Sequence, residues 1–118
     1  MTNNQNATPT FHVYEVAKEL ARACRPLIER IARSDRSLAD QARRASASAM
    51  LNIREGNRRT GRDRAQLFRI AAGSADELVG ALEVAEVMGY LSLADIAAPL
   101  ALADRVLAML YRLVHPRR

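Results

Sequence analysis

The hydrophobic residues of the chain recur at intervals of three and four positions, the spacing that places them on one face of an α-helix. Four segments carry this pattern, over about residues 9–33, 37–56, 61–88 and 92–115. No segment alternates between hydrophobic and polar residues as a half-buried β-strand does. The pattern therefore predicts an all-α fold, preceded by a polar N-terminal tail over residues 1–8 that we expect to be disordered.

The segments are separated by short connections that contain residues typical of helix ends. Gly56 and Gly89 stand where the second and third helices should end, each in the position that favours a left-handed glycine. Ser92 with Asp95 three residues later predicts a capping box at the start of the fourth helix. Short connections favour antiparallel neighbours, so we expect one domain over residues 9–118, an up-down-up-down four-helix bundle. A three-helix bundle with a docked fourth helix is the structural alternative.

Two prolines lie inside predicted helices. Pro26 cannot donate a hydrogen bond to the carbonyl of Arg22, so it should kink the first helix. A break into two helices is less favoured, because the hydrophobic face continues in phase across Pro26. Pro99 lies close to the start of the fourth helix and leaves open whether its first turns kink or break.

The second helix has a hydrophobic face built largely of alanine, which allows a neighbouring helix to pack closely. This face consists of Leu38, Ala42, Ala45, Ala49 and Ile53. Ser48 and Asn52 lie one turn apart at its edge. We interpret them as structural polar residues that bond a facing helix or a buried water, because Ser48 has no nearby histidine to activate it as a nucleophile.

The third helix contains two glycines, Gly73 and Gly80, seven residues apart. Each costs about 1 kcal/mol relative to alanine in a helix interior, so their shared side suggests close approach by another backbone. The predicted core face of this helix is Leu67, Ile70, Ala71, Ser74, Leu78, Ala81, Leu82, Ala85 and Met88.

The fourth helix is hydrophobic on two sides. One side should face the core through Ile96, Leu100, Ala103, Leu107, Leu110 and Val114. A second stripe consists of Leu102, Val106, Met109 and Leu113. A helix that is apolar on both sides is buried on both sides, and one bundle can bury only one. The second stripe therefore predicts an interface in a homo-oligomer.

Positive charge is concentrated in the middle of the chain. Residues 22–69 hold 13 Arg and five acidic residues, a net charge of +8, whereas the whole chain carries +5. Arginine pairs with phosphates in a bidentate way that lysine does not match. We predict a surface that contacts the RNA or DNA backbone without sequence preference, because no aromatic residue is near these arginines in the sequence to stack on bases. Its candidate residues are Arg43, Arg44, Arg54, Arg58, Arg59, Arg62 and Arg64. Genomic base composition and pairing with acidic residues are the competing explanations of the arginine content.

Candidate catalytic chemistry is sparse. Cys24 is the only cysteine, which excludes an intrachain disulfide and a cysteine-based metal site. His12 and His115 are isolated, with no ligand at metal-binding spacing. We therefore predict a protein that is not an enzyme and has no catalytic, cofactor or metal site. The polar N-terminus and the absence of a long apolar run predict a cytoplasmic protein with no membrane partner.

The segment 41–56, QARRASASAMLNIREG, resembles a motif of the 23S rRNA intervening-sequence protein family, whose members carry a pattern close to Q-I-R-R-A-A-x-S-I-P-S-N-I-A-E-G. The resemblance continues over about residues 11–115, through Val13-Tyr14-x-x-Ala17-x-Glu19-Leu20, Ile70-Ala71-x-Gly73-Ser74-x-x-Glu77-Leu78 and Gly89-Tyr90-Leu91. Met50 replaces the proline of the family pattern, which suggests an unbroken second helix.

The resemblance implies a four-helix bundle that assembles into a ring-like homopentamer. Similar bundles are basic accessory proteins of diversity-generating retroelements, which work with a reverse transcriptase and nucleic acid. Two functions are therefore predicted. The first is an oligomeric basic scaffold that binds nucleic acid without sequence specificity. The second is a structural adaptor that binds a protein partner, such as a reverse transcriptase-like enzyme, and not nucleic acid.

Overall fold

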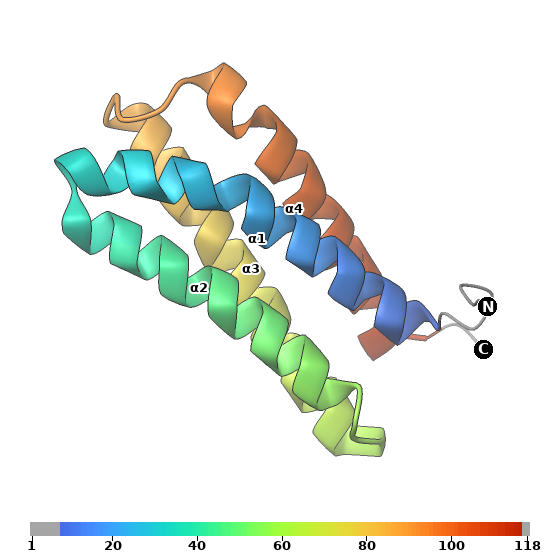
Figure 1. Cartoon of the computed structure of the whole chain (residues 1–118). Coiled ribbons are helices and arrows are strands. Elements are labelled where there is room, and N and C mark those ends of the chain that lie inside the picture. The colour runs from blue at the N-terminus through green and yellow to red at the C-terminus, as the bar shows by residue number, and fades with distance from the viewer. Residues whose placement is uncertain (1–7, 117–118) are drawn as a thin grey trace, which may run out of the picture.

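The computed structural model describes residues 8–116, which form four helices and no strand (Figure 1). They are α1 (Pro9–Ser34), α2 (Arg36–Gly56), α3 (Gly61–Val87) and α4 (Leu93–Val114). Every bound lies within one residue of the predicted one. Residues 1–7 of the tail predicted to be disordered lie outside the described residues, whereas Thr8 caps α1 by accepting a hydrogen bond from the backbone N–H of Phe11.

Consecutive helices run in opposite directions and lie side by side around the bundle (Figure 1). α1 packs against α2 and α4, and α3 packs against the same two helices. The up-down-up-down arrangement is therefore observed. The alternative of a three-helix bundle with a docked fourth helix is wrong, because α4 contacts both α1 and α3 and buries Ile96, Ala103, Val106 and Leu110 in the common core.

Both prolines are accommodated within continuous helices. Pro26 lies inside α1 with its ring exposed, and Pro99 lies inside α4 and is buried. The alternative in which either proline breaks its helix is therefore wrong.

The core face of α3 differs from the predicted one. Phe68 is fully buried, although the prediction placed Leu67 at this level of the core. Ile70 and Met88 are instead 43% and 59% exposed. The physical reason is that α3 is apolar around most of its circumference, so hydrophobic spacing alone does not select which side faces the core.

Gly56 makes room for Phe68. It is buried in the last turn of α2, where a Cβ atom would lie 2.5 Å from Cε1 and 2.8 Å from Cδ1 of the Phe68 ring. The prediction that Gly56 ends α2 in a left-handed conformation is wrong, because the positive φ angles belong to Gly61 and Gly89. Gly56 is instead the residue that lets the α2 backbone approach an aromatic ring.

The helix starts are fixed by acidic and hydroxyl side chains. Asp35, between α1 and α2, accepts a hydrogen bond from the backbone N–H of Leu38 at 2.9 Å. The predicted capping box of Ser92 and Asp95 is present at the start of α4. Asp95 also pairs with Arg30 of α1 at 3.1 Å. The hydrogen bonds from Arg30 and from Ser92 lower the pKa of Asp95 to about 2.

A polar contact joins α2 to α3 beside the alanine-rich face. The hydroxyls of Ser48 and Ser74 are 2.7 Å apart, and Ser74 is buried. The Asn52 amide donates from Nδ2 to the carbonyl oxygen of Ser48 at 2.9 Å and to its Oγ at 3.2 Å. Asn52 therefore orients Ser48, and Ser48 makes the bond between the helices.

Replacing Asn52 with alanine is expected to lower the free energy of unfolding by about 1 kcal/mol, since the bond that orients Ser48 is lost. Thermal unfolding followed by circular dichroism measures this change. Gln41→Ala is the matched control, because Gln41 is an exposed amide on the same helix. Asn52→Ala should leave nucleic-acid binding intact. Equal melting temperatures for Asn52→Ala and the parent would contradict the structural role.

Candidate nucleic-acid interface

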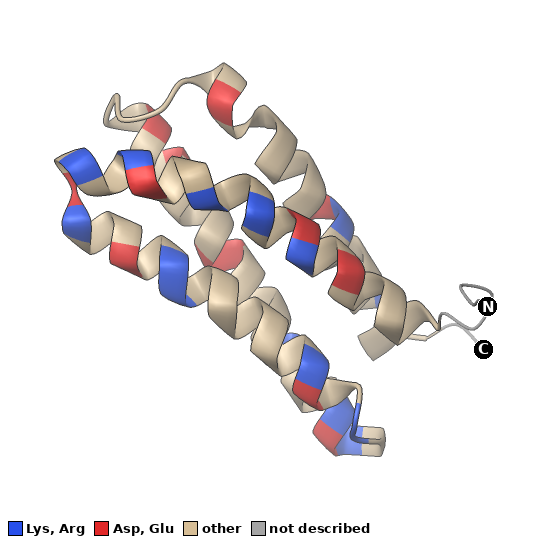
Figure 2. Cartoon of the chain, viewed as in Figure 1, with Lys and Arg blue, Asp and Glu red and all other residues tan. Residues whose placement is uncertain are grey.

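The seven arginines predicted to contact nucleic acid fall into two groups (Figure 2). Arg43 and Arg44 lie in the first half of α2, whereas the other five lie at the end of α2, in the following loop and at the start of α3. Arg54 is ten positions after Arg44, which corresponds to about 15 Å along the helix axis. The structure therefore does not bring the predicted residues into one continuous surface.

Three of the seven are engaged in contacts within the chain. Arg43 pairs with Asp40 at 2.9 Å, and Arg59 pairs with Glu55 at 2.6 Å. Arg64 is half-buried and donates from Nε and Nη2 to the carbonyl oxygens of Gly56 and Asn57, at 3.2 and 3.3 Å. Arg64 thus satisfies carbonyl groups at the C-terminus of α2. Arg64 therefore has a capping role within the chain, beside the contact with nucleic acid that stays a prediction.

Arg54, Arg58 and Arg62 are exposed and make no ion pair within the part of the chain that the structure describes. They lie at the corner of the bundle where α2 meets α3, the lower end of the view in Figure 2. We refer to these three residues as the basic corner. Arg54 lies in the last turn of α2, Arg58 in the loop and Arg62 in the first turn of α3, and all three side chains are open to solvent.

Aromatic residues of α1 lie beside the basic corner. The Arg54 guanidinium carbon is 5.8 Å from the centroid of the Tyr14 ring, and the Lys18 Nζ is 5.3 Å from it. Phe11, one turn before Tyr14, is 48% exposed. The prediction that no aromatic residue is near the arginines is therefore wrong, because it considered neighbours along the chain and not the packing of α1 against α2.

A pocket of about 320 Å³ connects these residues. Its lining consists of Phe11, Tyr14, Glu15, Lys18, Arg54, Asn57 and Arg58, and we refer to it as the aromatic pocket. Asn57 donates from Nδ2 to the carbonyl oxygen of Thr10 at 3.2 Å, which ties the loop to α1. Its Oδ1 is buried without a hydrogen-bond partner among residues 8–116. The pocket has a net positive charge, because Lys18, Arg54 and Arg58 outnumber its one carboxylate, Glu15. Glu15 pairs with Lys18 at 3.0 Å.

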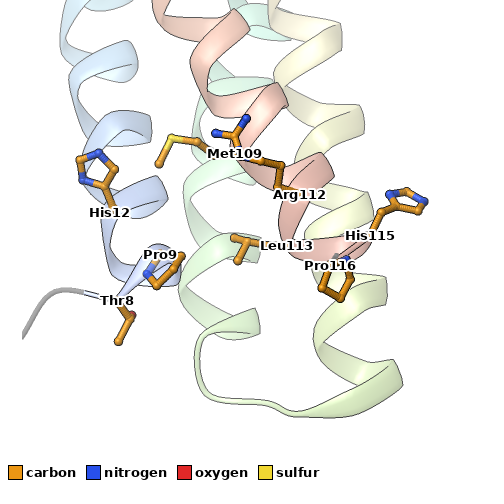
Figure 3. Close-up of a pocket in the computed structure, with 8 residues that line it drawn as sticks. All are labelled: Thr8, Pro9, His12, Met109, Arg112, Leu113, His115 and Pro116. Carbon is orange, nitrogen blue, oxygen red and sulfur yellow. The ribbon is translucent and has the colours of Figure 1, made fainter. Parts of the chain in front are cut away.

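The predicted oligomer stripe of α4 is not a surface that faces away from the bundle. Val106 is fully buried, and Leu102, Met109 and Leu113 are half-buried. Met109 and Leu113 line a depression of about 660 Å³ between the start of α1 and the end of α4 (Figure 3). The prediction is wrong for Val106 because α4 packs between two neighbours, so a wide arc of its surface is covered within one bundle.

An exposed apolar stripe occurs instead on α3. It consists of Ile70, Gly73, Glu77, Gly80, Val84 and Val87, which are spaced alternately three and four residues apart, and we refer to it as the α3 stripe. Val84 and Val87 are 46% and 78% exposed. A Cβ atom built on Gly73 or Gly80 would meet nothing within 4 Å. The close backbone approach predicted for these glycines therefore does not occur within the chain.

The other candidate chemical groups are accounted for by local contacts. The His115 ring stacks on Tyr111 with centroids 4.3 Å apart and points away from His12 (Figure 3). Cys24 is buried, and this burial raises the pKa of its thiol to about 11. Within residues 8–116, no group of three or more His, Cys, Asp or Glu side chains is arranged to hold a metal ion.

Comparison with known proteins gives the family. The model of the family described as 23S rRNA-intervening sequence protein matches residues 9–112, which include α1, α2, α3 and all but the last two residues of α4. The chain belongs to this family. No curated protein matches the chain.

A solved structure similar to this 23S rRNA-intervening sequence family member is a protein of unknown function from the S23 ribosomal protein family of Bacteroides thetaiotaomicron VPI-5482. The TM-score is 0.79 at 20% sequence identity, over 86% of this chain and 97% of the other. At this identity the similarity shows a shared fold. Among the described residues, none of the helices combines the length and the hydropathy needed to cross a membrane.

Proposed function

We propose that this protein is a non-enzymatic, oligomeric helical scaffold of the cytoplasm that binds the backbone of nucleic acids without sequence preference. The observation that carries the proposal is the basic corner, where Arg54, Arg58 and Arg62 are exposed and free of ion pairs within residues 8–116. Lys18, from α1, adds a fourth cation at the adjoining pocket. Phosphates bound by such a cluster release counterions, which makes the affinity strongly dependent on salt.

The proposal of no catalytic role is supported by the state of the candidate nucleophiles. The hydroxyls of Ser48 and Ser74 are engaged with one another. The raised pKa of Cys24 keeps its side chain in the thiol form at neutral pH. The thiol is unreactive, because the thiolate is the form that acts as a nucleophile.

Replacing Arg54, Arg58 and Arg62 together by alanine is expected to weaken binding to all nucleic-acid sequences about tenfold at low salt. The plot of log affinity against log salt should become less steep by about 2–3 units, since each phosphate contact contributes about one. Fluorescence anisotropy with short RNA and DNA at several salt concentrations measures both quantities.

The matched control replaces Arg22, Arg33 and Arg36 by alanine. These arginines are also exposed and make no ion pair in the described part of the chain. They lie away from the basic corner, Arg22 midway along α1 and Arg33 and Arg36 at the opposite end of the α1–α2 pair. The control removes the same charge, so it should retain binding close to that of the parent. Equal losses in the two triple variants would show that net charge alone governs binding, and no binding by the parent at tens of micromolar would overturn the proposal.

We further propose that the α3 stripe packs against a second copy of the chain. Full burial of a valine side chain contributes about 1.5–3 kcal/mol relative to full exposure, so covering Val84 and Val87 would be favourable. Gly73 and Gly80 have no side chain, which lets a partner helix approach closely. One acidic residue, Glu77, belongs to the stripe, and three more lie beside it at Asp76, Glu83 and Glu86. None of the four is ion-paired within residues 8–116.

The complementary surface for this stripe is a groove between α1 and α2. The groove has a volume of about 400 Å³, with Ala21, Ile28, Ala47 and Met50 as apolar lining. Its charged residues are Arg25, Arg43 and Glu29, which leave a positive balance. An acidic ridge in a basic groove is a heterologous contact, which closes into a ring when the rotation permits. The family resemblance to ring-like homopentamers supports five copies.

Val87→Arg is expected to convert the oligomer to smaller species, because it replaces a valine that is 78% exposed on the stripe with a charge of the same sign as Arg25 and Arg43 of the groove. Sedimentation velocity at micromolar protein measures this shift. Leu113→Glu on α4 is the comparison variant, since its side chain lies in the depression between α1 and α4. A parent protein that sediments as a monomer contradicts self-association, and dissociation by Leu113→Glu alone would move the interface to α4.

The second candidate function is an adaptor that binds a protein partner, such as a reverse transcriptase-like enzyme, and not nucleic acid. The α3 stripe favours it, because the same exposed apolar residues would fit a helix of another protein. The resemblance to accessory proteins of diversity-generating retroelements supports this partner class. Binding of the parent to RNA or DNA, lost in the basic-corner variant, would decide against it.

A further inference from the structure

The aromatic pocket combines one accessible ring with cations held at fixed positions. Phe11 is 48% exposed at the pocket, whereas Tyr14 already has the Lys18 ammonium and the Arg54 guanidinium within 6 Å of its ring centroid, at 5.3 and 5.8 Å. Phe11 is thus the ring left available for a ligand. The exposed part of the Phe11 ring is apolar surface that a stacked ligand would remove from water.

The cations have positions suited to a strand that continues past the ring. Arg58 lines the pocket, and Arg54 is held over Tyr14. Arg62, in the first turn of α3, extends the positive charge beyond the pocket. Stacking on an aromatic side chain combined with cations along the backbone is how single-stranded nucleic acids are bound without sequence preference.

The size and shape of the pocket favour an unpaired base over a duplex. Its volume of about 320 Å³ is at the small end of ligand pockets, which span about 300–1,000 Å³. The flat faces of bases are hidden inside a duplex and are accessible in single strands, loops and ends. A duplex could therefore contact the arginines of the basic corner but could not place a base against Phe11.

We infer that the aromatic pocket is a binding site for one unpaired nucleobase, so that the protein prefers single-stranded RNA or DNA to duplexes. In this arrangement the base stacks on Phe11, and Lys18, Arg54 and Arg58 contact the adjoining phosphates. Glu15 remains paired with Lys18 at 3.0 Å and lies at the edge of this charge pattern. The inference rests on the proposed function, because it assigns the nucleic-acid class that the basic corner binds.

The test compares three probes of equal length by fluorescence anisotropy at one salt concentration. They are a single strand, a hairpin duplex and a single strand in which abasic sites replace the bases, each prepared as RNA or DNA where the chemistry allows. Stacking on an aromatic residue contributes about 1–3 kcal/mol per base, which corresponds to about 5- to 150-fold in affinity. The parent should bind the ordinary single strand that much more tightly than the abasic strand.

Phe11→Ala should reduce single-strand affinity to that of the abasic strand and leave duplex binding unchanged, whereas Phe11→Trp should retain the preference. Tyr111→Ala is the matched control, because Tyr111 is an aromatic residue that is 65% exposed on α4. It should alter neither affinity. Circular dichroism of each variant checks that the bundle remains folded. We expect Phe11→Ala to fold, because it keeps the backbone N–H that donates a hydrogen bond to the Thr8 side chain.

The outcomes separate this inference from the proposed function. The inference would be overturned if the parent bound single strands, abasic strands and duplexes equally and Phe11→Ala changed none of these affinities. If the basic-corner variant still bound all three probes more weakly, the proposed function would stay in place. Binding of none of the three probes would overturn both.

Discussion

Replacing Phe68 with alanine is expected to lower the free energy of unfolding by about 3–5 kcal/mol, the usual cost of removing a fully buried phenylalanine. Phe68 is 0% exposed and is among the largest fully buried side chains of the described core. It packs against the last turn of α2 at Gly56, so its removal leaves a cavity between α2 and α3. Because a domain of this kind is stable by about 5–15 kcal/mol, the loss is a large share of the total.

Urea unfolding at fixed protein concentration measures this change. Phe11→Ala is the matched control, since the same substitution at a ring that is 48% exposed leaves no enclosed cavity. The control should lower the free energy of unfolding far less. Similar losses for the two variants would show that Phe68 does not occupy the core position described above.

Gly56→Ala and Gly73→Ala are expected to change stability in opposite directions. At Gly56, a Cβ atom would lie 2.5 Å from the Phe68 ring, and overpacking of this kind costs about 1–3 kcal/mol. At Gly73, a Cβ atom would meet nothing within 4 Å. Alanine there should instead add about 0.4–1 kcal/mol, because it favours the helix and restricts the unfolded chain.

Both glycine variants are best measured in the Val87→Arg background, so that self-association through the α3 stripe does not contribute to the measured stability. Urea unfolding midpoints at constant slope report the sign of each change. A stabilising Gly56→Ala would contradict the close contact with Phe68. In the oligomeric background, Gly73→Ala should weaken assembly if a partner helix packs over the stripe, and a neutral effect on assembly would place the partner elsewhere.

The candidate site could be predicted in part from the sequence. The arginine excess of residues 22–69 pointed to the region that includes the basic corner, because charge is a local property of the chain. The sequence did not indicate that Arg64 caps α2, since that role depends on carbonyl groups freed at a helix end. Nor did it place Phe11 and Tyr14 beside Arg54, about 40 residues later in the chain, because only the packing of α1 on α2 brings them together.

The sequence by itself determined the helices, since three- and four-residue spacing and the residues at helix ends act within one or two turns. Ser92 and Asp95 capped α4 as predicted for this reason. Tertiary structure decided which side of an apolar helix is buried. α3 is apolar around most of its circumference, so contacts with α2 and α4 turned Phe68 inward and left Val84 and Val87 exposed. α4 has two neighbours in the bundle, and its packing against both of them buried Val106, which the sequence pattern had placed in an exposed stripe.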